Sequence, residues 1–332
     1  MKLLKLVPDN TNINFLKWRI PFYVMSALLM VASIALVMTK GLNLGVDFVG
    51  GQMIRVTFER SAEAPVVELR EQVERLGYGE PIIQRYGKPN EISIRMKLPE
   101  GSEHDASLSD TMARKITAEI KSNHADARID GVDSVSGKVS GELFRTGMVA
   151  LVAAMVAISI YIWVRFEWQF GVGALLSLAH DVTLTLGLFA LTGMEFDLNI
   201  VAALLTLIGY SLNDTIVVYD RIRENLKKYR KMQIAEVLNL SVNETLSRTI
   251  VTSLSMLITL VTLLFLGPDV IFGFTAAITL GIFVGTYSSV YMAAPILIWL
   301  KVTPKSFIPV ETELERQERL AREGLPGEKS PR

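Results

Sequence analysis

The sequence predicts a polytopic α-helical membrane protein with six spans and one extracytoplasmic α+β domain, of the ferredoxin-like βαββαβ type, between spans 1 and 2. Half of the residues are apolar and the mean hydropathy is positive, although a fifth of the residues are charged. A soluble domain rarely has that hydropathy, whereas a membrane protein with polar parts attached has it naturally. Six predominantly apolar runs and one long polar stretch then divide the chain into membrane and domain.

The first apolar run predicts an uncleaved membrane anchor. Residues 20–39 contain no charged side chain and are long enough to cross a hydrocarbon core of about 30 Å. The run is long for the hydrophobic part of a signal peptide, and no small-x-small cleavage site precedes Lys40. Residues 1–19, with Lys17 and Arg19 beside the run, are therefore expected to form a cytoplasmic N-terminus.

The polar stretch, residues 40–146, predicts the folded domain. Apolar and polar residues alternate in some segments as in half-buried strands, and recur in others at helical spacing. The candidates follow one another as strand, helix, strand, strand, helix and strand, at residues 52–58, 66–76, 81–86, 91–97, 108–120 and 128–135. That order is the split βαβ, ferredoxin-like arrangement.

Five further apolar runs predict spans 2 to 6, at residues 147–164, 170–191, 198–219, 250–266 and 271–299. Cytoplasmic loops of membrane proteins carry an excess of Lys and Arg. Several basic residues lie between spans 4 and 5, and Arg165 lies between spans 2 and 3. The turns between spans 3 and 4 and between spans 5 and 6 contain no Lys or Arg. We therefore expect a cytoplasmic loop at 220–249, a charged cytoplasmic tail at 300–332, and a periplasmic domain at 40–146.

Two charged residues in spans 4 and 5 are candidates for a proton relay. Asp214 follows Asn213 among apolar neighbours, where a carboxylate costs about 2.5–3.5 kcal/mol on insertion scales. Arg248 opens the next span from the same side. A carboxylate that alternates between pairing with a cation and taking up a proton is typical of a proton relay. Snorkelling to the membrane surface is the alternative for Arg248.

Four further polar residues are candidates for a supporting role. His180 and Asp181 lie near the middle of span 3, either in a relay or as a buried hydrogen-bonded pair that fixes helix packing. Asn213 precedes the candidate carboxylate. Asp220 closes span 4 beside Arg221 at the membrane interface, a position that needs no functional explanation.

The glycine-rich segment after span 1 predicts a hinge between membrane and domain. It contains Gly45, Asp47, Gly50 and Gly51, and glycine absorbs large changes in φ and ψ. The alternative is a tight turn that enters a strand, and the two are compatible.

Several chemistries are excluded by what the sequence lacks. There is no Cys, which excludes disulfides, thiol catalysis and Cys-ligated zinc. There is neither a G-x-x-x-x-G-K-[ST] motif nor an H-E-x-x-H motif, so the chain is not a P-loop ATPase. Net charge is zero, which gives no bulk attraction for nucleic acid. We expect no cofactor, no metal and no enzyme activity.

Three segments together resemble one known family: residues 45–51 (GVDFVGG), 136–143 (SGKVSGEL) and 211–225 (SLNDTIVVYDRIREN). With the layout of spans, they closely resemble the SecF family, the smaller half of the bacterial SecD–SecF accessory complex of the Sec translocon. SecF-like proteins are related to the resistance–nodulation–division transporters. The resemblance extends from the first span through the sixth.

The resemblance implies a proton-driven role in protein export at the bacterial inner membrane. The important intramembrane aspartate and arginine of the family fall on Asp214 and Arg248. The implied partners are a SecD-like membrane subunit, the Sec translocon channel, YajC- or YidC-like proteins, and an unfolded preprotein, with no nucleic acid. Proton flow would drive movement of the outer domains that draws the preprotein outward.

Three other functions are alternatives to this one. A self-sufficient proton-coupled exporter of small molecules or lipids would usually have two six-span halves in one chain, and only one is visible here. A membrane scaffold would use its buried charges only to set helix register. An intramembrane hydrolase would need a nucleophile beside His180 and Asp181, and no Ser has a defensible position for it.

Overall fold

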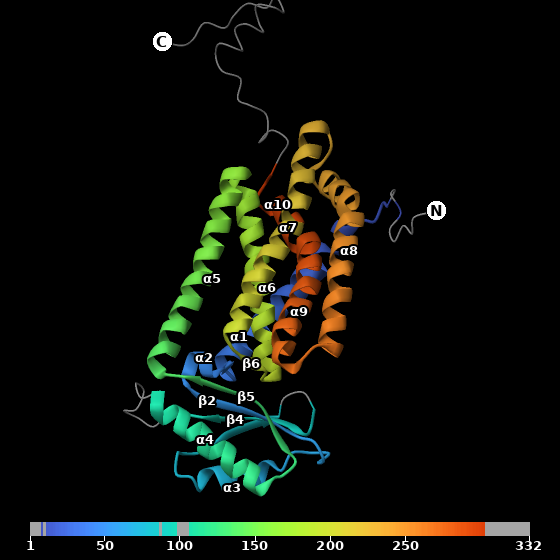
Figure 1. The fold of residues 1–332 in the computed structure, drawn as a ribbon. Helices are drawn as coiled ribbons and strands as arrows, with labels where there is room; N and C mark the ends of the chain where they lie inside the picture. The colour runs from blue at the N-terminus through green and yellow to red at the C-terminus, as the bar shows by residue number, and fades with distance from the viewer. Residues whose placement is uncertain (1–7, 9–10, 86–87, 98–105, 303–332) are drawn as a thin grey trace, which may run out of the picture.

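The computed structural model describes residues 8, 11–85, 88–97 and 106–302, which form a long helical bundle with an α+β domain at one end (Figure 1). Most of the predicted tail, residues 303–332, and most of the first ten residues lie outside the described residues. The chain crosses the bundle once, builds the α+β domain, and returns for the rest of the bundle.

Six helical segments are long and apolar enough to cross a membrane, which confirms the predicted fold class: Phe15–Thr39, Val139–Arg165, Trp168–Thr192, Leu198–Lys228, Ile234–Leu266 and Phe272–Trp299. The first five comprise η1 (Phe15–Trp18) with α1 (Arg19–Thr39), α5 (Gly137–Arg165), α6 (Trp168–Thr192), α7 (Leu198–Lys228) and α8 (Ile234–Leu266). After η2 (Asp269–Ile271), the sixth consists of α9 (Phe272–Ser288), the π-helical turn η3 (Ser289–Ala293) and α10 (Ala294–Trp299).

Helices α7 and α8 extend well beyond the predicted spans. The stretch 220–249, which the sequence predicts as a loop, is mostly helical, and only residues 229–233 connect the two helices. Ile222 and Leu226 of α7 and Val237 of α8 are fully buried in this region. Apolar residues at helical spacing thus pack the two helices against each other beyond the apolar runs. The charged residues between these positions lower the mean hydropathy, so the sequence pattern does not show the helices here.

The α+β domain has the predicted ferredoxin-like topology. Its sheet is antiparallel in the order β3-β4-β2-β5, with strands β2 (Gly51–Phe58), β3 (Ile82–Arg85), β4 (Glu91–Met96) and β5 (Ala127–Val135). Helices α3 (Val66–Glu74) and α4 (Ala106–Asn123) cover the face turned away from the bundle (Figure 1). Their core includes Ile54, Val56, Phe58, Leu69, Val73, Ile92, Ile94, Met112, Ile116 and Ile120.

A short connector links the two parts of the molecule. Strand β1 (Asn43–Leu44) pairs in parallel with β6 (Glu195–Phe196), which lies between α6 and α7. The short helix α2 (Val46–Val49) follows, and Phe48 packs edge-on against Phe144 of α5 with ring centroids 5.5 Å apart. The segment after the first span therefore lies against the connection between two later membrane helices.

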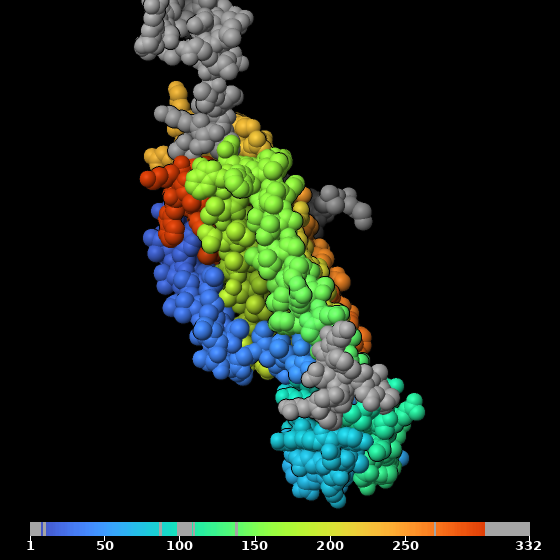
Figure 2. All heavy atoms as spheres, turned by 90° about the vertical axis from the view of Figure 1, so that its left-hand side faces the viewer, coloured from blue at the N-terminus to red at the C-terminus, as the bar shows by residue number. Residues whose placement is uncertain are grey.

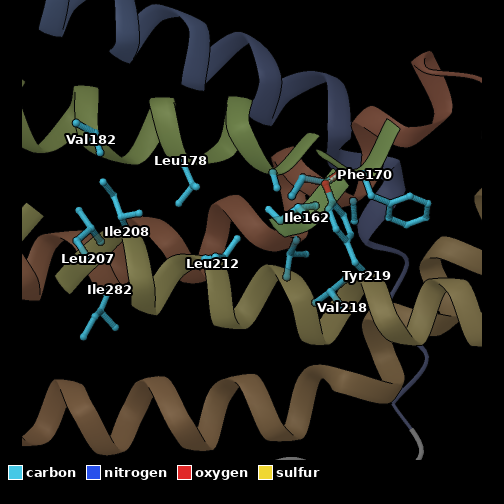
Figure 3. Close-up of a cluster of buried hydrophobic side chains, with 14 of the residues drawn as sticks. Ile162, Phe170, Leu178, Val182, Leu207, Ile208, Leu212, Val218, Tyr219 and Ile282 are labelled. Atoms are coloured by element: carbon cyan, nitrogen blue, oxygen red, sulfur yellow. Dashed lines mark hydrogen bonds between the residues drawn. The ribbon is translucent and has the colours of Figure 1, made fainter. Parts of the chain in front are cut away.

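The bundle core is apolar and closely packed around α6, α7 and α9. Figure 3 shows Val182 of α6, Leu207 and Ile208 of α7, and Ile282 of α9 near one another in the interior. The small residues that recur every fourth position in the last span permit this packing, since a Cβ at Gly281 would collide with Leu207.

Helices α1, α5 and α8 lie on the outside of the bundle. Figure 2 shows α5 running along the surface toward the α+β domain. Most apolar side chains of α1 and α5 are exposed, as lipid-facing or partner-facing side chains would be.

Candidate functional site

Asp214 lies on the buried face of α7, and its carboxylate is held by hydroxyl groups from two other helices. Thr249 Oγ1 of α8 donates to Oδ1 at 2.6 Å, and Ser289 Oγ of the π turn η3 donates to Oδ2 at 2.7 Å. The residue is 7% exposed. Three of the six membrane segments therefore meet at one carboxyl group.

The π turn that supplies Ser289 ends just before a proline. Pro295, at the start of α10, has no backbone N–H, and its ring crowds the carbonyl four residues earlier. Pro295 therefore cannot donate to the carbonyl of Tyr291, and the N–H of Ala294 donates to the carbonyl of Ser289, five residues earlier. The carbonyl of Ala293 also accepts a hydrogen bond from Tyr219 Oη at 3.0 Å. Single π turns within helices are frequent at functional sites.

A second carboxylate, Asp181 of α6, is completely buried beside His180. His180 Nδ1 lies 2.9 Å from Asp181 Oδ1. Ser211 Oγ of α7 and Ser288 Oγ of α9 donate to Oδ2 at 2.5 and 3.0 Å. On the other side of the ring, Tyr287 Oη lies 2.8 Å from His180 Nε2. Every polar atom of the pair thus has a partner.

Two consecutive residues at the start of the π turn bind the two carboxylates. Ser288 donates to Asp181, and the next residue, Ser289, donates to Asp214. Ser211, which also binds Asp181, lies about one helical turn before Asp214 in α7. The result is one polar cluster in an apolar bundle, built by α6, α7, α8 and the last span.

The charge of Arg248 acts on the Asp214 carboxyl without a direct hydrogen bond or ion pair. Among the described residues, no hydrogen bond or ion pair joins the two, and Arg248 is exposed. It lines a cavity of about 240 Å³ together with Asp220, Glu224 and Glu244. Adjacent residues of a helix point about 100° apart, so Thr249 faces α7 while Arg248 faces this cavity. A relay role for Arg248 stays a prediction.

The structure places the other two supporting candidates outside the cluster. Asn213 is exposed on the outer surface of α7, and its side chain makes no hydrogen bond within the described part of the chain. Asp220 is exposed and forms an ion pair with Arg165 at 3.4 Å. The position of Asp220 fits the interfacial interpretation.

Several polar residues of the cluster escaped sequence analysis: Ser177, Ser211, Thr249, Tyr287, Ser288 and Ser289. Hydroxyl residues are common in membrane helices, where they bond to their own backbone. The only available signal was their recurrence within apolar spans at positions that could face a carboxylate.

The glycine-rich segment forms a turn that is hydrogen-bonded to the start of α7. Gly50 and Gly51 have φ values of +76° and +113°, which favour glycine, and a Cβ at Gly51 would collide with the carbonyl of Met96. Asp47 Oδ2 accepts a hydrogen bond from the backbone N–H of Leu198 at 3.0 Å, at the start of α7. A carboxylate is favourable at a helix N-terminus. Movement about these glycines stays a prediction.

Arg95 of β4 fastens the α+β domain to the connector. Its guanidinium donates to Asn43 Oδ1 at 3.1 Å and to the carbonyl of Leu44 at 2.8 Å, and pairs with Glu195 Oε1 at 3.1 Å. Burial raises the pKa of the Glu195 carboxyl, and Arg95 opposes that shift. The domain, the connector and the α6–α7 connection thus meet at one guanidinium.

Comparison with known proteins gives matches over nearly the whole chain. Residues 115–303 match the C-terminal family model of the protein export membrane proteins SecD/SecF, and residues 35–62 match the SecD/SecF GG motif. The chain is 44% identical over 306 residues to the protein translocase subunit SecF of Rhodobacter capsulatus, covering 90% of this chain and 91% of that protein. It is 37% identical over 317 residues to SecF of Vibrio alginolyticus, covering 95% and 98%.

The fold is similar to that of solved SecDF structures. The translocon-associated membrane protein SecDF from Thermus thermophilus aligns with a TM-score of 0.81 and 34% identity over 89% of this chain. A structure of SecDF in a super-membrane-facing form aligns with a TM-score of 0.64 and 33% identity over 95%. This chain spans 40% of the length of either SecDF chain.

Proposed function

The chain belongs to the SecF proteins of the SecD/SecF family of protein export membrane proteins, and from this premise we propose that it is a proton-driven accessory subunit of protein export. In this proposal Asp214 takes up and releases the protons, and the energy moves the α+β domain on the periplasmic side of the bacterial inner membrane. Both ends of the chain would lie in the cytoplasm.

The observation that carries the proposal is that hydroxyl groups make both hydrogen bonds to the Asp214 carboxyl. A hydroxyl both donates and accepts hydrogen bonds. Thr249 and Ser289 can therefore donate to an ionised carboxylate, and either can accept from a protonated one. The group can change its charge without rebuilding its surroundings, which a group locked in an ion pair cannot do.

The energy available is sufficient for a domain movement. One elementary charge that crosses 100 mV releases about 2.3 kcal/mol, which shifts a two-state equilibrium by about fifty-fold. No ATP is required, in keeping with the absence of a P-loop motif.

Helix α7 offers a direct mechanical route from the carboxyl to the domain. Its first residue, Leu198, binds Asp47 of the connector, and Asp214 lies on the same helix, about 24 Å further along. A shift of α7 at Asp214 would therefore act on the connector and, through Arg95, on the sheet. This gives the glycine-rich segment a physical reason to move.

A second membrane subunit fits one exposed stripe of α7. Ala202, Thr206, Gly209 and Asn213 lie on its outer surface at helical spacing, and no atom lies within 4 Å of a Cβ added at Gly209. Small residues and an amide in a span are typical of close helix contacts. We therefore propose a SecD-like partner on this stripe, and the Sec translocon channel and an unfolded preprotein as further partners.

The proposal is tested with Asp214→Asn, which keeps the shape of the side chain but cannot exchange a proton. Inverted membrane vesicles that contain the variant and its SecD-like partner should lose the part of preprotein export that depends on an imposed proton gradient. Asp220→Asn is the matched control, because that carboxylate is exposed and outside the cluster. If Asp214→Asn vesicles respond to the gradient as strongly as wild type, the carboxyl only sets helix packing.

A further inference from the structure

The bundle holds a second group that is built to carry a proton, on the opposite side of the π turn from Asp214. We propose that His180, with Asp181 as its fixed counter-ion, takes up and releases a proton through a hydrogen-bonded path formed by Tyr287 and Ser26. The proposal rests on the proton-driven function above and adds a carrier to it.

The path is continuous and buried at both of its ends. Ser26 Oγ of α1 lies 2.6 Å from Tyr287 Oη, which in turn lies 2.8 Å from His180 Nε2. Ser26 and His180 have no exposed surface. The two buried side chains of α1 are both serines, Ser26 and Ser33, so the first helix turns hydroxyl groups into the bundle at these positions.

The first helix approaches closely enough for this contact because α6 has a glycine opposite Ser33. A Cβ at Gly187 would lie 3.0 Å from Ser33 Cα and would collide with its side chain. Ser33 lies about two helical turns beyond Ser26 on the same side of α1. The crossing at Gly187 thus holds Ser26 within reach of Tyr287.

The hydroxyl chain can reverse its direction, which is what proton transfer requires. With a neutral ring, Nδ1–H donates to Asp181, Nε2 accepts from Tyr287, and Tyr287 accepts from Ser26. A hydronium ion that reaches Ser26 gives its proton to Ser26 Oγ and leaves as water. The hydroxyl proton of Ser26 then passes to Tyr287, and Tyr287 gives its own to Nε2. Afterwards the imidazolium donates to Tyr287, and Tyr287 donates to Ser26. The net change is one proton added at Nε2 and a reversal of the two hydrogen bonds.

Asp181 has the hydrogen-bond donors that an ionised carboxylate needs. It accepts from His180, Ser211 and Ser288, and a carboxylate with three donors is not an unsatisfied buried charge. Uptake of a proton by His180 then converts a buried anion into a neutral ion pair. Histidine is the side chain that ordinarily changes charge near neutral pH.

The titratable groups around the ring come from three helices. Asp181 lies on the same helix, Tyr287 comes from α9, and Asp214 of α7 lies across the π turn. The remaining contacts to the pair are hydroxyls, from Ser288 and Ser211. Since Ser288 and Ser289 are consecutive, a change in charge at one carboxylate site reaches the other through a single turn of chain.

A pair that only fixed packing would tolerate a partner of the same shape that cannot titrate. His180→Gln places an amide near the position of Nε2, where it can still bond with Tyr287 but cannot carry a proton. In the complex with the SecD-like subunit, we expect gradient-dependent export in inverted vesicles to fall by about tenfold or more. His124→Gln is the matched control, because His124 lies in the α+β domain beside Gln72.

Tyr287→Phe and a direct titration keep the proposal testable if His180→Gln fails to assemble. Tyr287→Phe keeps the ring but removes the hydroxyl between Ser26 and His180, and we expect the same loss of gradient response. In the wild-type complex, ¹⁵N-histidine NMR should show whether His180 gains a proton as the pH is lowered, and the proposal requires that it does.

The outcomes separate this inference from the proposed function. If Asp214→Asn loses the gradient response while His180→Gln or Tyr287→Phe keeps it, the second carrier is overturned and the proposed function stands. A ring that stays neutral over the whole pH range also overturns the second carrier. If Asp214→Asn keeps the response, the proposed function itself fails, whatever His180 does.

Discussion

At Asp214, two hydroxyl groups from different helices take the place that a cation would occupy in an ordinary buried ion pair. The Thr249 hydroxyl supplies the contact from α8. Thr249→Val preserves the shape of the side chain but leaves Oδ1 without its donor, which costs about 1–3 kcal/mol for a buried polar group when the carboxyl is ionised. We therefore expect a lower thermal stability in detergent and a weaker response of export to the proton gradient.

Thr249→Ser is the control for that variant, because it keeps the hydroxyl and loses only a methyl group. Its gradient response should stay close to wild type. Equal responses of Thr249→Val and wild type would show that the hydroxyl is not part of the relay.

The residue scale also shows where prediction from sequence reached its limit. Asp214 was identifiable because a carboxylate in an apolar span is costly and therefore conspicuous. Thr249 and Ser289 carry no such cost and look like any hydroxyl residue of a span. Arg248 was expected beside the carboxyl, yet its neighbour Thr249 faces α7, because the rotation of a helix relative to its neighbours is set by packing across the bundle.

At the scale of the helices, a close crossing at Gly187 brings the first span against α6. Gly187→Ala would drive a Cβ into Ser33 and force α1 away from α6. We expect a loss of about 1–3 kcal/mol in stability, typical of overpacking, measured as a lower unfolding temperature of the purified protein.

Gly147→Ala provides the matched glycine control for that experiment. The closest atom to a Cβ there is Val201 Cγ1 at 3.6 Å, an ordinary van der Waals contact. A fall in unfolding temperature of the same size in both variants would point to helix propensity or backbone effects instead of the α1–α6 crossing.

The sequence predicts the presence of each helix more reliably than the residues at which it begins and ends. The six spans and the βαββαβ order rest on local periodicity, which one stretch of chain carries by itself. The extension of α7 and α8 through 220–249 depends on their packing against each other. The π turn η3 depends on Pro295 and on the Tyr219 hydroxyl from another helix, so no single segment encodes it.

For the whole molecule, the exposed stripe on α7 is the feature with the clearest consequence for assembly. Gly209→Leu should leave the isolated chain stable, because no atom lies within 4 Å of a Cβ at that position. In mild detergent it should reduce the recovery of the SecD-like subunit with the tagged chain.

Gly209→Ala should reduce that recovery less, since the side chain is smaller. An undiminished yield of complex with Gly209→Leu would place the partner on another surface. A fall in the unfolding temperature of the isolated chain would mean that the stripe packs within this subunit.

The contact between Asp47 and Leu198 can form only late in the synthesis of the chain. The two residues are 151 positions apart, and the α+β domain is complete at β5, well before α7 has been translated. At about 5–20 residues per second, the ribosome needs roughly 8 to 30 s to make the intervening chain. During that time the new domain is attached to the membrane only through the first span, and the connector has no binding partner at α7. Asp47 can bind Leu198 only after the fourth span has been synthesised.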